Sequence, residues 1–465
     1  MIKSIKAIMR QDREPYRVPR RVQDVIPIQC VWPDGIFRVG IKFSKTYRFT
    51  DINYKVAGQE DKETMFRVYS ELLNSLDCAA TTKLTICNRR QSQTDFEQSV
   101  LMPMREDGLD KYRREYNQML MNKATGANGI TQEKYVTITI YKRDIEDARA
   151  YFTRIGANLT ARFAALGSKC VELDATERLR ILHDFYRQGE ESEFVFNARE
   201  MMKRGHSFKD YICPDGIEKN SDYLKLGGKF CRVLFLKDYA SYIKDNMVTE
   251  LTDFNRNLMF SIDIVPVPTD EAVREVENRL LGVETNITNW QRRQNANNNF
   301  TATVPYDMEL QRKETKEMLD DLTTRDQRMM FGLVTLVHLA DSKEQLDSDT
   351  ETLYSTARRH LCQLSTLRWQ QKDGLDTVLP YGLRKIQSPA HADHRKHRCA
   401  DSVSRAGNHA VEWSVLRAER RQQEHDRGGS PLAAQRQQLP FGRFGFRQEY
   451  ERQGRNRADR ALHRG

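Results

Sequence analysis

The residues best suited to binding a metal lie near the C-terminus. They are His391, His394, His397 and Cys399, spaced H-x2-H-x2-H-x-C. Imidazole and thiolate are ligands that zinc accepts, but this spacing matches none of the common structural zinc patterns. Histidine-rich tracts often reflect composition alone, and the flanking sequence supplies no apolar core to orient ligands. We therefore expect no metal site in this tract.

The nearest approach to a phosphate-binding loop is Gly227-Gly228-Lys229. The GxxxxGK[ST] motif needs all its parts to cradle phosphate. Here Tyr223 stands at the first glycine position and Phe230 replaces the Ser or Thr. We expect no nucleotide site at this position.

Asp263, in the apolar stretch SIDIV, is the remaining candidate metal ligand. Residues alternate between the two faces of a strand, so a single acidic residue is more simply placed on a polar face. The sequence thus assigns no catalytic, cofactor-binding or metal-binding residue, and no cofactor is expected for the chain.

Charge is concentrated at the C-terminal end of the 465 residues. The segment Ser388–Gly465 holds 15 Arg and 1 Lys against 9 Asp and Glu, a net charge of +7 out of +10 for the chain. Arginine with interspersed aromatic residues is one way to bind nucleic acid, through phosphate contacts and base stacking. The aromatic residues of this segment are Trp413, Phe441, Phe444, Phe446 and Tyr450. The body before Ser388 gives no charge-based reason to expect nucleic acid or membrane as a partner.

Cysteine usage and hydropathy predict a cytoplasmic protein. The eight cysteines form no CxxC pair, and the N-terminus lacks the apolar stretch of a signal peptide. The longest apolar run, Met329 to Ala340, is too short to cross a bilayer. We expect no direct insertion into the membrane.

The first half of the chain predicts strands and helices in alternation. Strands are expected at 25–32, 36–43 and 45–54, with Pro33-Asp34-Gly35 forming a tight turn between the first two. Apolar residues at helical spacing predict helices at 60–76, 109–122, 144–166 and 175–187. Further strands are expected at 83–90, 134–142 and 171–173.

The second half predicts a sheet layer with a long helical hairpin. After a polar, irregular stretch at 189–223, strands are expected at 229–239, 258–268, 329–340 and 365–371, and a helix at 341–361. The hairpin is expected at 270–327, with its second helix at 306–325. The first helix carries a seam at steps of three and four residues, made of Val273, Val276, Leu280, Val283, Ile287 and Trp290. This seam could pack within one chain, with the hairpin lying on the sheet, or join two copies of the chain.

These elements predict an α+β fold, with mixed sheets, packed helices, the helical hairpin and a small antiparallel element at the N-terminus. The expected organisation is an arm and small sheet (1–60), an α/β subdomain (61–188), a second α+β subdomain (189–387) and a disordered tail (388–465).

Four segments of the body resemble a known family. They are DKETMFRVYSELLNSLDCAATTKLTICNR, YVTITIYKRDIEDARAYFTRIGANLTARF, LMFSIDIVPVP and RMMFGLVTLVHLADSKEQLDSDTETLYSTARR. From about Val22 to Gln387 the chain resembles the N-terminal region of the conjugative-transfer ATPases of type IV secretion, the CagE/TrbE/TraE group that includes the fourth VirB component. The resemblance implies docking to inner-membrane secretion components at the cytoplasmic face of the membrane. ATP and magnesium are implied only for the family's motor domain.

The sequence changes character at the seam between Gln387 and Ser388, where the family's motor domain should be approaching. Beyond the seam, Ile, Met and Thr disappear. FGRFGFRQEY can be encoded by bases that, read one position later, give LGVSGSGKS, a complete phosphate-binding loop. SPAHADHRKHRCADSVSRAG permits ALRTLTTESTAVLIPFR in the same shifted frame. We therefore expect a frameshifted tail, an absent motor and no ATP hydrolysis. The alternative is a basic nucleic-acid-binding protein that uses the tail.

Overall fold

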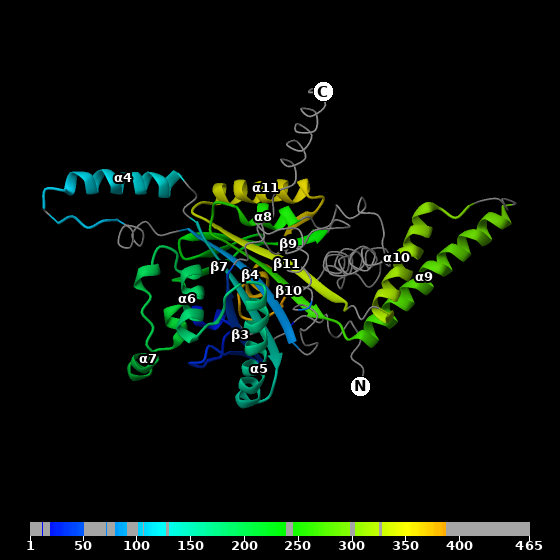
Figure 1. The fold of residues 1–465 in the computed structure, drawn as a ribbon, viewed down its shortest axis with the longest axis horizontal. Coiled ribbons are helices and arrows are strands. Elements are labelled where there is room, and N and C mark those ends of the chain that lie inside the picture. Colours follow the sequence, from blue (N-terminus) through cyan, green and yellow to red (C-terminus); the bar gives the residue numbers. More distant parts are fainter. Residues whose placement is uncertain are drawn as a thin grey trace, which may run out of the picture.

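The computed structural model describes residues 12, 19–50, 71, 80–90, 101–105, 107–126, 130–238, 245–297, 303–324 and 328–386. Within this part of the chain the fold is α+β, as predicted, and its centre is a twelve-stranded sheet (Figure 1). Most of the predicted helix at 60–76 lies outside the described residues, as do the tail, its histidine cluster and its aromatic residues.

The strands pair antiparallel throughout the described residues, whereas mixed sheets were expected. Their order is β1-β2-β3-β5-β4-β10-β11-β9-β8-β7, with β6 also paired to β3 and β12 to β9. The strands are β1 (Cys30–Val31), β2 (Phe37–Val39), β3 (Lys42–Phe49), β4 (Ala80–Arg90), β5 (Ile130–Tyr141), β6 (Cys170–Glu172), β7 (Ile217–Lys219), β8 (Leu224–Leu226), β9 (Lys229–Asp238), β10 (Leu258–Pro266), β11 (Met330–Ala340) and β12 (Gln363–Thr366). Because β4 pairs with β10, the sheet runs without interruption through both predicted subdomains.

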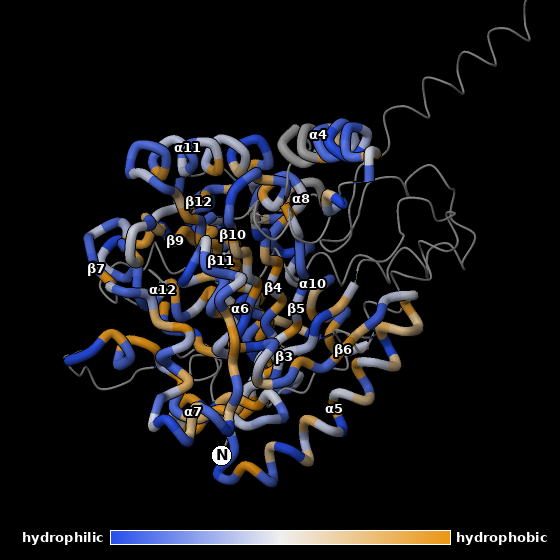
Figure 2. The backbone as a smooth tube through the Cα atoms, turned by 90° about the vertical axis from the view of Figure 1, so that its left-hand side faces the viewer, coloured by the Kyte–Doolittle hydropathy of each residue, from blue (hydrophilic) through white to orange (hydrophobic). Residues whose placement is uncertain are grey.

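Helices cover both faces of the sheet. They are α4 (Asp110–Gly126), α5 (Ile145–Ala165), α6 (Ala175–Tyr186), α7 (Ala198–Arg204), α8 (Asp245–Thr252), α9 (Thr269–Ala296), α10 (Tyr306–Thr324), α11 (Lys343–Arg359) and α12 (Gln371–Val378). Apolar residues of α5, α8 and α11 join one core on the first face. The second face is covered by α6, by α12 and by the extended segment after α12. We call residues 371–386 the strap. In Figure 2 much of the outer helices α11 and α4 is coloured as hydrophilic residues.

Helices with strong sequence signals form where they were predicted. Asp144 precedes α5, and Asp174 caps α6 by accepting a hydrogen bond from the Glu177 backbone N–H. The side chain of Glu177 accepts the reciprocal bond from Asp174, which completes a capping box. The α9 helix begins at Thr269, directly after Pro268.

The predicted strand at 25–32 is wrong for most of its length. A 3-10 turn, η1 (Val22–Val25), occupies its start, and only Cys30 and Val31 form a strand. Pro27 has no N–H to offer a neighbouring strand. Ile26 and Ile28 are nevertheless buried, so the apolar residues that suggested a strand serve the second core from irregular backbone.

Two further expectations are corrected by backbone geometry. Gly40, at a φ of 58°, forms the turn between β2 and β3 inside the predicted strand 36–43. The predicted strand 365–371 ends early, because β12 stops at Thr366 and Trp369 has a φ of 61°. A left-handed residue cannot continue a strand. The helix α12 that follows had not been predicted.

The polar stretch 189–223, predicted as a linker or a surface excursion, is a folded excursion. It contains η2 (Glu191–Glu193), α7, η3 (Phe208–Tyr211) and β7. Ile212 and Cys213 anchor it, because both are buried in the second core.

Candidate functional site

A buried row of polar side chains crosses the second face of the sheet beneath the strap. In register across four adjacent strands stand Thr46, Thr137, Lys83 and Asp263. The Thr46 and Thr137 hydroxyls lie 2.9 Å apart, and the Lys83 ammonium lies 3.3 Å from the Asp263 carboxylate. If one of these strands slipped by one residue, its own polar side chain would turn to the opposite face and leave the row. The row therefore helps to fix the register of the strands.

Lys83 and Asp263 form an ion pair that is closed to solvent. Their side chains are only 1% and 2% exposed. Burial lowers the pKa of Lys83 and raises that of Asp263, because removal from water disfavours both charges, while each charge partly offsets this for the other. Asp263 Oδ2 has no hydrogen-bond partner among the described residues.

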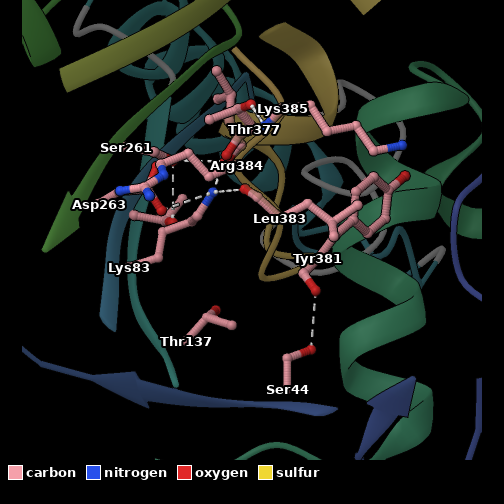
Figure 3. Close-up of polar contacts among 12 residues, drawn as sticks. Ser44, Lys83, Thr137, Ser261, Asp263, Thr377, Tyr381, Leu383, Arg384 and Lys385 are labelled. Carbon is pink, nitrogen blue, oxygen red and sulfur yellow. Dashed lines mark hydrogen bonds and ion pairs between the residues drawn. The ribbon is translucent and has the colours of Figure 1, made fainter. Parts of the chain in front are cut away.

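The sheet binds the strap mainly through the main-chain carbonyls of the strap (Figure 3). Lys83 donates to the carbonyls of Thr377 and Leu383, so one ammonium binds the strap at two points. Ser261 donates to the carbonyl of Val378 at 2.7 Å, and Ser44 donates to that of Tyr381 at 3.1 Å.

A buried arginine completes this set of contacts. Arg178, on α6, donates to the carbonyls of Gly35, Ser44 and Pro380 at 2.7–2.9 Å. Its guanidinium carbon lies 3.7 Å from the centre of the Phe37 ring. Burial lowers the pKa of Arg178 to about 9. Apart from Asp263 Oδ2, the polar groups named in this region bond to one another or to main-chain carbonyls of the fold, which is a structural role.

Asp263 was expected on a polar strand face, and the structure corrects its environment. The face is polar but buried, because the strap covers it. Within the described residues, no group of three or more His, Cys, Asp or Glu side chains is arranged to hold a metal ion. Asp263 is paired with an ammonium instead.

The Gly227-Gly228-Lys229 stretch forms the tight turn between β8 and β9. Gly227 has a φ of 58°, which explains a glycine at this corner. Lys229 forms an ion pair with Asp341, at the end of β11. The stretch has the geometry of a β-hairpin and does not precede a helix as a phosphate-binding loop does.

The hairpin of α9 and α10 stands out from the body of the fold, as does α4 at the left of Figure 1. The hairpin leaves the sheet between the paired strands β10 and β11 and projects from the body, at the right of Figure 1. The prediction of a helical hairpin is confirmed, but the hairpin does not lie on the sheet as expected. Its ends are close, because the Val267 N–H donates to the Met329 carbonyl at 2.9 Å.

The hairpin is tied to the sheet through a small third core at its base. This core consists of Val265, Val267, Ala272, Val276, Leu322 and Met329. Farther out, Ile287 and Thr315 are buried, and Lys316 pairs with Glu284 at 3.6 Å. The predicted seam of α9 therefore packs within the chain against α10. The outer residues Leu281 and Tyr306 remain 64% and 76% exposed.

The strap and its contacts were missed by sequence reasoning. The only local signal was Lys83 in the alternating stretch TKLTI, where it occupies the face opposite Leu84. Its partners Asp263 and Thr377 are distant in sequence, so their proximity could not be predicted from spacing.

A scan against protein-family models finds no match, and a search of curated proteins finds no matching relative. Across the described residues, no helix has both the length and the apolar character needed to cross a bilayer.

Proposed function

We propose that residues 1–387 form a docking and assembly domain of a conjugative DNA-transfer machine, equivalent to the N-terminal region of its type IV secretion ATPase. The observation that carries this proposal is the projecting α9–α10 hairpin. Two long helices that bury apolar residues mainly against each other and at their base contribute little to the main cores. Such an arm suits contact with a partner protein.

The proposed partners are inner-membrane components of the secretion machine, reached from the cytoplasmic side. The resemblance of the body to the ATPase family supports this choice. The domain would associate with the membrane through these proteins rather than by insertion. The printed sequence contains no complete GxxxxGK[ST] motif, so we expect purified protein to release no phosphate from ATP above background.

Co-purification tests the docking role. The tagged full chain is co-expressed with the inner-membrane secretion components of a conjugative element and isolated in mild detergent. In a variant, residues 269–324 are replaced by a short Gly-Ser linker. Because Val267 and Met329 already pair, the linker should close without disturbing β10 and β11. We expect the full chain to retain the partners and the variant to lose them.

A variant lacking residues 388–465 is the matched control, and it should retain the partners. Equal co-purification by the chain without the hairpin would refute the hairpin as the docking site. Failure of the full chain to retain any component would refute the docking function itself.

We also propose that residues 388–465 are read out of frame. Sequencing the gene tests this directly: the next frame should encode a GKS-containing run opposite Phe441 to Tyr450. Its absence would refute the proposal. Salt-sensitive DNA binding that disappears with residues 388–465 would instead support the nucleic-acid alternative.

A further inference from the structure

A cleft of about 310 Å³ lies between α6 and the sheet, and none of its lining residues belongs to the hairpin or to the strap. Its apolar lining comes from Leu173, Ile181, Phe185, Leu258 and Leu339. This volume is at the lower end of the range for ligand pockets, enough for one large side chain of a bound segment.

Charged residues surround this apolar lining, and the acidic ones are already engaged. Glu133 accepts a hydrogen bond from the Tyr135 hydroxyl at 2.6 Å, and Glu177 accepts one from the Asp174 backbone at 3.1 Å. Asp184 accepts one from Arg89. Each of these carboxylates thus accepts a hydrogen bond within the fold, from an uncharged donor for Glu133 and Glu177 and from a guanidinium for Asp184.

Two arginines of the cleft are engaged much less closely. Arg48 stands 3.8 Å from carboxylate oxygens of Glu133 and Glu177, and Arg180 stands 4.0 Å from Asp184. Among the described residues, neither guanidinium donates a hydrogen bond at these distances. Their side chains are about half exposed. A guanidinium can donate two parallel hydrogen bonds to a carboxylate, so both retain unused binding capacity.

We propose that this cleft binds an acidic segment of a partner protein, with one apolar or aromatic side chain entering the cleft and an adjacent carboxylate meeting Arg48 and Arg180. The inference rests on the proposed docking function and adds a second contact to it. The ligand carboxylate would gain short, charge-assisted hydrogen bonds, compared with the long ion pairs now present. An apolar anchor flanked by a charged contact is a common form of interface hot spot.

The cleft lining includes a cysteine and a tyrosine, and burial disfavours the ionised form of both. Burial raises the pKa of the Cys87 thiol to about 12, so the thiol is neutral near pH 7. Tyr135 likewise has a pKa well above its ordinary value, chiefly because of burial.

Fluorescence anisotropy with a short peptide tests the proposal on the full chain. The probe is fluorescein-labelled Gly-Ser-Phe-Asp-Glu-Gly. Two comparison peptides replace Phe by Gly, or Asp and Glu by Asn and Gln. Arg48→Gln and Arg180→Gln should each weaken binding of the probe about tenfold, the effect of losing one charge-assisted hydrogen bond. Arg204→Gln is the control, because Arg204 pairs with Glu200 on α7, outside the cleft.

Both comparison peptides should bind more weakly than the probe. The proposal would be overturned if the Gly-containing peptide bound as tightly as the probe, or if the Arg48→Gln and Arg180→Gln variants bound the probe as tightly as the wild type. Failure of the probe to bind at all would also overturn it. Full displacement of the probe by inorganic phosphate, with no dependence on Phe, would indicate a simple anion site and overturn it as well. If the peptide fails to bind but hairpin-dependent co-purification persists, the cleft inference alone is refuted.

Discussion

At the scale of single residues, the least expected feature is an ion pair at the centre of the sheet. Taking Lys83 and Asp263 out of water is costly, and well-packed apolar residues often replace such pairs without loss of stability. The pair does something that apolar residues cannot, because Lys83 also binds two carbonyls of the strap. We infer that it selects the position of the strap as well as contributing to stability.

Substitution of Lys83 tests this inference. Lys83→Met leaves Asp263 buried without its partner and should lower the free energy of unfolding by about 3–5 kcal/mol. The double variant Lys83→Met with Asp263→Leu should recover much of this loss, yet hydrogen exchange of residues 377–385 should stay faster than in the wild type. Lys142→Met, at an exposed site after β5, is the control. Full protection of the strap in the double variant would contradict the positioning role.

Gly382 offers a test of close packing between strap and sheet. It has a φ of 81°, and an added Cβ would lie 2.1 Å from the Thr139 hydroxyl oxygen. Gly40 also has a positive φ, 58°, but an added Cβ there meets no atom within 4 Å. Gly40→Ala should cost about 1–2 kcal/mol of stability from backbone strain alone. Gly382→Ala should cost about 1–3 kcal/mol more from overpacking. Equal losses in urea titrations would argue against a tightly packed strap.

His338 predicts a dependence of stability on pH. It is fully buried beside Arg232, its Nε2 lies 3.1 Å from the Thr350 hydroxyl, and burial lowers its pKa to about 3. The unfolded chain takes up this proton as the pH falls below about 6.5, whereas the folded chain resists until near pH 3. Stability should therefore be full above pH 6.5 and should decline as the pH falls, by at most about 1.4 kcal/mol per pH unit.

The contribution of His338 can be isolated with His338→Gln, which keeps a polar group near Thr350 but cannot be protonated. Urea titrations between neutral pH and pH 5 should show a smaller decline for this variant than for the wild type. Identical declines would mean that other groups, such as the carboxylates, account for the whole effect.

At the scale of elements, the hairpin combines an anchored base with an exposed outer face. Val276 is 1% exposed in the third core, so Val276→Ala should destabilise the base by about 1–3 kcal/mol. Leu281, 64% exposed on the same helix, should tolerate alanine within about 0.5 kcal/mol. Hydrogen exchange in α9 and α10 measures both. Comparable protection in the two variants would contradict the third core as the anchor.

The difference in burial between Val276 and Leu281 also decides which residue can be used to test self-association. An acidic substitution at Val276 would disrupt the base of the hairpin within one chain. Leu281→Asp changes only the exposed face, so light scattering on that variant reports on contact between copies of the chain.

Elements with regular apolar spacing could be predicted from sequence, and those shaped by distant contacts could not. The α5 and α9 helices follow from their periodicity and their N-terminal residues. By contrast, α12 contains Gly374 in the middle of a short polar sequence, and it forms because it is buried against the sheet. The side chains of Leu367 and Val233 pack within 3 Å of where a Cβ on Gly374 would be, so that helix requires a glycine.

At the scale of the whole molecule, the strap is part of the folded body, so the chain should tolerate truncation after the strap but not before it. Removal of residues 388–465 should leave the melting temperature unchanged. Removal of everything from Gln371 onward should abolish cooperative unfolding, because it strips Leu375, Tyr381 and Ile386 from the second core. Calorimetry of both truncated chains measures this. A cooperative transition in the shorter chain would show that the strap is dispensable.

The candidate sites illustrate what the sequence could and could not predict. The helical hairpin was predictable, because two amphipathic helices separated by a polar loop fold back on each other locally. The cleft under α6 was not, because it brings together Arg48, Arg180 and Leu339 from three distant parts of the chain. The direction in which the hairpin projects also depends on the complete sheet.

The position of the strap in the sequence also sets an order of events during synthesis. Ser44, Lys83 and Thr139 leave the ribosome long before the strap residues that cover them, which are Thr377, Tyr381, Gly382 and Leu383. Until then, the hydroxyls and the ammonium of the second face can keep their hydration. One edge of β4 stays unpaired until β10 has been made. Long-range pairings of this kind form slowly. If translation stalls before Tyr381 is added, the strap-covered part of the second face therefore stays exposed to water, where chaperones and proteases could reach it.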